Sequence, residues 1–311
     1  MGSDAPSTRL AGSAPTHRHQ AARAATCENG VVPESFADRF AAVRPTQGPL
    51  VLGLDPSADL LEGWGLGDTA NGLDKFADIV LAAAAGAVGL VKPQSAFYER
   101  HGWRGIRTLE RLISTAHGLG LLVILDIKRG DVGTTNDAYA EAYLGKGAPL
   151  AADAITVHPY LGLDAMGAFV TRAAESGSCL LVVTRSSNPE GRVMQSALAP
   201  GGRTVEQELL VQIGALNAGL APGGIGPVGA VIGPAHIEPE LDLAAAQCLF
   251  LAPGVGAQGA TSADVAQVFA GCPNRVMPSA SRSLLAAGPD VSRLRDAAKA
   301  LAAEFRSALP G

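Results

Sequence analysis

The sequence lacks the features that mark disulfide-rich, membrane-spanning or nucleic-acid-binding proteins. Its four cysteines form no C-x-x-C pair, so neither zinc ligation nor a redox motif is indicated. The longest apolar stretch, 79–91, contains glycines and is too short to cross a bilayer. The net charge is −5 and no basic stripe is visible, so we expect neither a nucleic-acid nor a membrane partner. No apolar run near the N-terminus looks like a signal peptide, and the predicted location is therefore cytoplasmic.

Lysine is also scarce, with five residues against nineteen arginines. One of the five lies in the run LDIKRGD at 125–131, directly after an apolar, strand-like stretch. Residues two apart on a strand share a face, so Asp126 and Lys128 should project together, with Asp131 in the loop beyond. Arginine would serve a plain ion pair better, so this pattern indicates that Lys128 is a titratable or proton-donating amine.

The remainder of the chain predicts one α/β domain preceded by an irregular segment. Residues 1–33 show no periodicity, which predicts a disordered extension or an expression-tag remnant. Eight apolar runs then alternate with helical patterns over residues 34–311, as in a (β/α)8 TIM barrel. A doubly wound sheet would favour a Gly-rich fingerprint after the first strand, where the sequence instead reads GLDPS at 53–57. The predicted strands are 50–54, 89–91, 121–125, 154–157, 180–183, 228–232, 249–251 and 275–277, and the predicted helices are 72–87, 105–119, 135–144, 165–176, 204–218, 239–246, 262–270 and 291–309.

Charged side chains gather where the first three predicted strands end. Barrel active sites lie at the carboxyl ends of the strands, so Asp55, Lys92, Asp126, Lys128 and Asp131 should form one alternating array. Opposed charges at such distances lower carboxylate pKa values and keep amines protonated. A structural ion pair between Asp126 and Lys128 is the plainer alternative, and Lys92 alone is equally compatible with a structural role.

A second group of candidates follows the last two predicted strands. The loop 253–259 is rich in glycine, and the segment 278–282 has small residues followed by Arg282. Loops in these positions of a barrel often bind phosphate through backbone N–H groups and a helix N-terminus. Arg282 would add a charge-assisted contact, so we expect a phosphorylated small molecule as the substrate class.

The run LDIKRGDVGTT at 125–135 resembles the signature of orotidine 5′-phosphate decarboxylases, most closely that of the longer bacterial subgroup. The resemblance covers nearly the whole chain from about residue 36 and includes GLDP at 53–56, VKPQ at 91–94, SSNPEG at 186–191 and APGVGAQG at 252–259. The D-x-K-x-x-D core alone also occurs in sister decarboxylases and aldol-type enzymes. The extended run together with the other segments is more specific.

This resemblance implies a homodimeric, metal-free decarboxylase that makes uridine 5′-phosphate (UMP) and CO2 in pyrimidine synthesis, with no cofactor. It implies that Lys128 protonates C6 of the pyrimidine and that Asp126 lies beside the departing carboxylate. The other implied contacts are Asp55 and Lys92 with the ribose, Asp131 and Thr135 across the dimer interface, Ser186 or Ser187 with the base, Gln258 with base and phosphate, Gly259 in the same loop, and Arg282 with the phosphate.

Three other functions remain open at this level. A superfamily relative could act on a sugar phosphate with Mg²⁺, and a Schiff-base aldolase could use Lys128 or Lys92 as its nucleophile. The third is a catalytically inactive, nucleotide-binding barrel, which would have no need of a charge cluster that is costly to desolvate.

A lid is also predicted from the sequence. Residues 185–203 are long enough, and rich enough in Gly and Pro, to form one.

Overall fold

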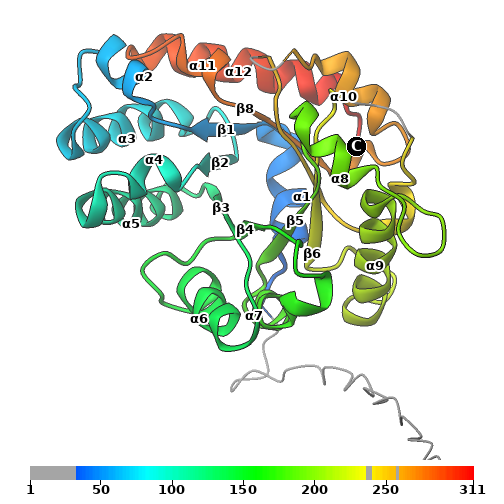
Figure 1. Cartoon of the computed structure of the whole chain (residues 1–311). Coiled ribbons are helices and arrows are strands. Elements are labelled where there is room, and N and C mark those ends of the chain that lie inside the picture. The colour runs from blue at the N-terminus through cyan, green and yellow to red at the C-terminus, as the bar shows by residue number, and fades with distance from the viewer. Residues whose placement is uncertain (1–32, 236–239, 257–258) are drawn as a thin grey trace, which may run out of the picture.

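The computed structural model describes residues 33–235, 240–256 and 259–311, and these form a closed barrel of parallel strands surrounded by helices (Figure 1). The strands follow one another around the barrel in sequence order, and β8 pairs with β1. The predicted (β/α)8 barrel is thus confirmed, while the prediction for residues 1–33 falls almost wholly outside the described residues. The strands are β1 (Val51–Leu54), β2 (Leu90–Pro93), β3 (Leu122–Arg129), β4 (Ala154–Val157), β5 (Cys179–Arg185), β6 (Val228–Ile232), β7 (Phe250–Ala252) and β8 (Val276–Ala280).

Helices of very different length connect these strands. The longer ones cover the outside of the barrel, and several short helices follow strand ends. The α-helices are α1 (Phe36–Gln47), α2 (Ala58–Gly63), α3 (Ala70–Ala84), α4 (Ala96–Glu99), α5 (Gly102–Gly118), α6 (Gly133–Leu144), α7 (Gly167–Ser176), α8 (Arg192–Gln195), α9 (Val205–Leu220), α10 (Ser262–Val268), α11 (Arg282–Leu285) and α12 (Val291–Ala308). The 3₁₀ turns are η1 (Leu163–Met166), η2 (Pro189–Gly191), η3 (Ala244–Ala246) and η4 (Pro273–Arg275).

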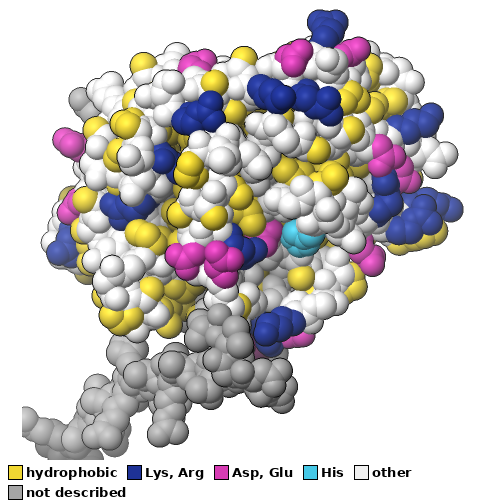
Figure 2. All heavy atoms as spheres, turned by 180° about the vertical axis from the view of Figure 1, so that it is seen from behind, with side chains coloured by type: hydrophobic (Ala, Val, Ile, Leu, Met, Phe, Trp, Pro, Cys, Tyr) yellow, Lys and Arg dark blue, Asp and Glu magenta, His cyan; other side chains and the backbone are white. Residues whose placement is uncertain are grey.

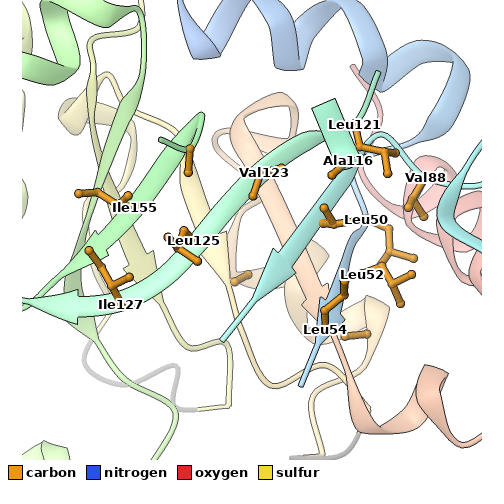
Figure 3. Packing of buried hydrophobic residues seen from close by; sticks show 14 of the residues in the cluster. Leu50, Leu52, Leu54, Val88, Ala116, Leu121, Val123, Leu125, Ile127 and Ile155 are labelled. Atoms are coloured by element: carbon orange, nitrogen blue, oxygen red, sulfur yellow. The ribbon is translucent and has the colours of Figure 1, made fainter. Parts of the chain in front are cut away.

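Alternation along the strands divides the apolar core into two layers. Val123, Leu125 and Ile127 of β3 belong to the large cluster that packs between strands and helices, as the close view in Figure 3 shows. Leu122 and Ile124 belong to a smaller cluster inside the barrel. Successive side chains of a strand point to opposite faces, so every second position of β3 lies in the interior. The site described below continues this interior row.

Helix α1 closes one end of the barrel and was not expected from the sequence. Its Phe36 and Phe40, one helical turn apart, are both 1% exposed and pack with the interior cluster. The Ser35 hydroxyl begins the helix by accepting a hydrogen bond from the Asp38 amide at 3.1 Å. With few other buried positions, α1 has little of the apolar periodicity by which a helix is recognised in a sequence.

The helix expected over 239–246 is wrong in its described part. Residues 240–246 contain only the single 3₁₀ turn η3, and Gln247 follows it with a φ of 47°. The Asn217 side chain of α9 donates hydrogen bonds to the carbonyls of Ala246 and Gln247, both at 3.3 Å. The Asn217 side chain, distant in sequence, thus satisfies two carbonyls at the end of this irregular segment.

The surface does not separate into regions of one charge on the face shown in Figure 2. Lys and Arg side chains are interspersed there with Asp and Glu, without a continuous basic band. Among the described helices, none combines the length and apolarity needed to cross a membrane.

Replacing Phe40 with alanine tests the role of α1 as the closure of the barrel end. Because the ring is fully buried, Phe40→Ala should lower the free energy of unfolding by about 3–5 kcal/mol. Denaturant titration measures the change, with Val211→Ala, at a 39% exposed position of α9, as the control. A loss below about 1 kcal/mol, similar to that of a surface substitution, would contradict the packing role.

Candidate active site

The charged residues at the strand ends form the last layer of the barrel interior. Asp126 follows Leu122 and Ile124 on the inward face of β3, and Lys92 follows Leu90 on the inward face of β2. Asp126 and Lys92 are each only 6% exposed. The alternation that buries apolar side chains lower in the barrel therefore brings the two charges together at its carboxyl end.

One carboxylate holds both lysines of this layer. Asp126 Oδ2 accepts from Lys92 Nζ at 2.9 Å, and Asp126 Oδ1 accepts from Lys128 Nζ at 2.5 Å. The Thr156 hydroxyl donates to the same Oδ1 at 2.7 Å. The Lys128 side chain is 38% exposed, against 8% for Lys92. Lys128 is thus the more exposed of the two ammonium groups.

Mutual attraction keeps the buried members of the network ionised. Burial opposes the charged form of Asp126, but attraction to Lys92 and Lys128 outweighs it and holds the Asp126 pKa far below its usual value. Burial likewise opposes protonation of Lys92, yet attraction to Asp126 and Asp55 raises its pKa above the usual value. At His158, after β4, burial and then repulsion from Lys128 lower the pKa, which favours the neutral ring. The site is therefore a fixed array of opposite charges over the neutral pH range.

Thr156 was not recognised as a site residue from the sequence, although it ties the array together. It is 1% exposed in β4, and its hydroxyl also accepts from the Lys128 amide at 3.1 Å. Lys128 has a φ of 45°, and the β3–β4 register shifts between Leu125 and Arg129. A non-glycine residue in this left-handed region is strained, so the Thr156 contact helps to hold it there. Thr156 could have been identified from the sequence by the period of two along the strand, which places positions 154, 156 and 158 on one face.

Two buried oxygens point to a hydroxyl-bearing or otherwise polar ligand. Asp55 Oδ1 and Ser281 Oγ have no hydrogen-bond partner among the described residues. Both residues line a cavity of about 350 Å³ at the carboxyl ends of the strands, together with Lys92, Asp126 and Lys128. Buried polar atoms are normally paired, so these two oxygens mark positions where a ligand can supply the missing hydrogen bonds.

The remaining predicted residues divide into those that line this cavity and those that do not. Ser186, Ser187 and Arg282 line it, whereas Gly259 lies at the base of the β7–α10 loop, its amide bonded to the Gly256 carbonyl at 2.9 Å. Gln258 lies outside the described residues. Asp131 and Thr135 are not among the lining residues, and Thr135 is exposed on α6. Three predicted residues that the structure describes, Gly259, Asp131 and Thr135, are thus absent from the cavity lining of one chain.

Arg185, the last residue of β5, is buried and does not line the cavity. It is 2% exposed, and its guanidinium donates to both oxygens of the fully buried Glu206 at 2.7 and 2.8 Å. Among the described residues, no group of three or more His, Cys, Asp or Glu side chains is arranged to hold a metal ion.

Fold and site together define a (β/α)8-barrel protein with a preorganised lysine–carboxylate array inside its carboxyl end. Comparison with known proteins agrees and is more specific. Residues 48–297 match the model of the orotidine 5′-phosphate decarboxylase / HUMPS family, so the chain belongs to that family. The family resemblance expected from the sequence is confirmed.

Curated relatives and solved structures support the same placement. The orotidine 5′-phosphate decarboxylase of Salinispora arenicola is 48% identical over 278 residues, covering 89% of this chain and 99% of the relative. That of Streptomyces coelicolor is 46% identical over 277 residues, with the same coverage. A crystal structure described as a candidate orotidine 5′-phosphate decarboxylase from Streptomyces avermitilis superposes with a TM-score of 0.86 at 44% identity, covering 91% of this chain and 99% of the other. Carboxy-lyases are thus the enzyme class of its relatives.

The charge state of Asp126 gives a pH-dependent prediction. Its pKa in the folded protein lies below the unfolded value of about 3.9, so its ionisation contributes stability above about pH 4. That contribution is lost as the pH falls toward the folded-state pKa, whereas the side chain of Asp126→Asn does not titrate. Relative to the variant, the wild-type free energy of unfolding should fall by up to about 1.4 kcal/mol per pH unit below about pH 4.

Denaturant titrations of both proteins at about pH 6, 4 and 3 measure this difference. The raised pKa of Lys92 affects only the alkaline side, where stability is lost as the pH rises through its folded-state pKa. A wild-type-minus-variant difference that is the same at all three acid values would contradict the ionised, lysine-paired Asp126.

Proposed function

We propose that this protein converts orotidine 5′-phosphate to UMP and CO2 without a metal ion, and that Lys128 donates the proton to C6. The observation that carries the proposal is the Lys128 ammonium, held by Asp126 at 2.5 Å and facing the cavity. Family membership and the names of the curated relatives support the choice of substrate. UMP formation places the reaction in pyrimidine synthesis.

The array suits the electronic demand of this reaction. When the bond from C6 to the carboxylate breaks, its electron pair stays on C6 in the plane of the ring, where no adjacent carbonyl delocalises it. The Lys128 ammonium stabilises that charge and transfers a proton to C6, then regains a proton from solvent. Asp126 holds Lys128 in place and lies beside the departing carboxylate. Because the array exists before the ligand arrives, little reorganisation accompanies the reaction.

The other cavity residues suit the rest of the nucleotide. Asp55, with its unpartnered Oδ1, and Lys92 are placed to contact ribose hydroxyls. The Arg282 guanidinium suits the phosphate, next to the glycine-containing turn at Gly254. Ser186 and Ser187, which line the cavity, are assigned to the pyrimidine. Gln258 and Gly259 are assigned to base and phosphate by their match to the family motif.

We infer further that the active form is a homodimer in which Asp131 and Thr135 complete the site of the other subunit. Neither residue lines the cavity of its own chain. Nearby, Val132, Tyr160 and Leu161 are 55%, 78% and 51% exposed, which is unusual for apolar side chains on one side of a site. The His158 amide donates to the Arg129 carbonyl at 3.0 Å, so the loops that bear these side chains are in contact. A cytoplasmic location stays a prediction.

An absorbance assay with orotidine 5′-phosphate in the presence of EDTA tests the reaction and its proton donor. The wild type should decarboxylate the substrate, and Lys128→Ala should be slower by at least about a thousandfold because the stabilising charge and the proton are both lost. Lys146→Ala, at an exposed position outside the cavity lining, is the matched control and should retain full activity. A folded wild type that does not turn over orotidine 5′-phosphate would contradict the proposal and favour a Mg²⁺-dependent sugar-phosphate enzyme of the same superfamily.

Mixing two inactive variants tests the shared site. Lys128→Ala and Asp131→Ala homodimers should both be nearly inactive. After subunit exchange, half of the dimers are heterodimers, each with one site that has both native residues. About a quarter of the wild-type sites should therefore be recovered. If the mixture stays as inactive as its components while exchange is demonstrated, Asp131 does not act across the interface.

A further inference from the structure

The residues between β5 and α9 form a segment, 186–204, that begins in the cavity and is anchored outside it. Ser186 and Ser187 line the cavity directly after Arg185, the last residue of β5. The chain then makes η2 and the single turn α8 before it returns to the start of α9. The position of the two serines therefore depends on what holds this segment in place.

Gln195, the last residue of α8, holds Ser186 through two hydrogen bonds. Its Oε1 accepts from the Ser186 amide at 3.1 Å, and its Nε2 donates to the Ser186 hydroxyl at 2.8 Å. A side-chain amide that pairs with both the backbone and the hydroxyl of one residue fixes the position and the rotamer of that residue. The Ser186 hydroxyl oxygen accepts from Gln195, so the hydroxyl proton remains available for donation to another group.

Close packing leaves this pair little freedom to move. A Cβ on Gly191 would lie 2.5 Å from Ser186 Oγ and 2.9 Å from Gln195 Nε2. On the other side, a Cβ on Gly233 would lie 2.8 Å from the Ser187 amide nitrogen and Cα. Two glycines thus allow the backbone of 186–187 and the Gln195 amide to pack against their neighbours at distances that no other residue type permits.

The same turn of helix is tied to the barrel wall by a buried carboxylate. Arg192 lies three residues before Gln195 and therefore on the same side of α8. Its guanidinium contacts Glu206 at 3.2 and 3.3 Å, and Glu206 is fully buried against Arg185. Helix α8 therefore joins the end of β5 to the start of α9, with Gln195 as the side chain that extends toward the cavity.

We propose that Gln195 is a positioning residue for recognition of the pyrimidine ring. By holding Ser186, it fixes the backbone that presents the Ser187 hydroxyl to the base, while the ribose and phosphate are bound by groups on other strands. The inference rests on the proposed function. It extends that function by assigning the base selectivity of the site to a residue that does not itself line the cavity.

Two ligands that differ only in the base separate this role from a general structural one. UMP contains base, ribose and phosphate, whereas ribose 5-phosphate lacks the base. Gln195→Met keeps the side-chain length but removes both hydrogen bonds, and should weaken UMP binding by about tenfold without changing ribose 5-phosphate binding. Gln195→Glu can accept from both the amide and the hydroxyl of Ser186, so it should restore most of the UMP affinity.

Calorimetric titration of both ligands into the full-length variants makes the comparison, with Val193→Ala as the matched control. Val193 lies in the same helix and is 82% exposed, so both affinities should stay at the wild-type value. Equal weakening of both ligands by Gln195→Met, or unchanged UMP binding, would overturn the proposal. A wild type that binds ribose 5-phosphate but not UMP would overturn the proposed function itself, and the role of Gln195 with it.

Discussion

The structure depends on one buried carboxylate that is shared by two lysines. Asp126 is 6% exposed, and an isolated charge at such a position would be strongly disfavoured. The ammonium groups of Lys92 and Lys128 offset that cost, and the Thr156 hydroxyl adds a third donor. A pair of this kind contributes little net stability compared with apolar residues of similar size, so its value lies in what the fixed charges do to a ligand.

The barrel makes this arrangement possible because different positions along each strand have different roles. Lower interior positions stabilise the fold, and positions near the carboxyl end form the site. Lower interior positions are filled by apolar side chains such as Ile124 and Leu181, and the cavity floor is lined by Val183, Val231 and Leu251. The charged side chains of Lys92 and Asp126 lie in the last interior layer, above these apolar residues. The Lys128 ammonium is consequently held on a rigid wall, which is the requirement for electrostatic stabilisation of a developing negative charge.

Much of this arrangement could be predicted from the sequence because it follows from periodicity. The eight strands and the convergence of Asp55, Lys92, Asp126 and Lys128 result from strand alternation and from the common carboxyl edge of parallel strands. Features that depend on tertiary contacts were missed. Helix α1 is held by two phenylalanines that pack with the barrel interior, and the end of the 240–246 segment is held by a hydrogen bond from Asn217 of α9 to the Ala246 carbonyl.

The site residues that were missed share one property, which is that they act through another residue. Thr156 and Gln195 are uncharged, and neither lies in a run that stands out from the surrounding sequence. Their importance comes from the distances to Asp126, to the Lys128 amide and to Ser186, which only the folded chain defines. Strand periodicity could have indicated Thr156, whereas no local pattern connects Gln195 with a residue nine positions earlier.

A crystal structure of the protein with UMP would test the central claim most directly. The account predicts that C6 of the pyrimidine lies within hydrogen-bonding distance, about 3 Å, of Lys128 Nζ, that the ribose lies against Asp55, and that the phosphate contacts Arg282. It also predicts that Asp126 still bridges the two lysines. A nucleotide bound with C6 turned away from Lys128, or with its phosphate at the Asp126 layer, would contradict the assignment of this array as the decarboxylating centre.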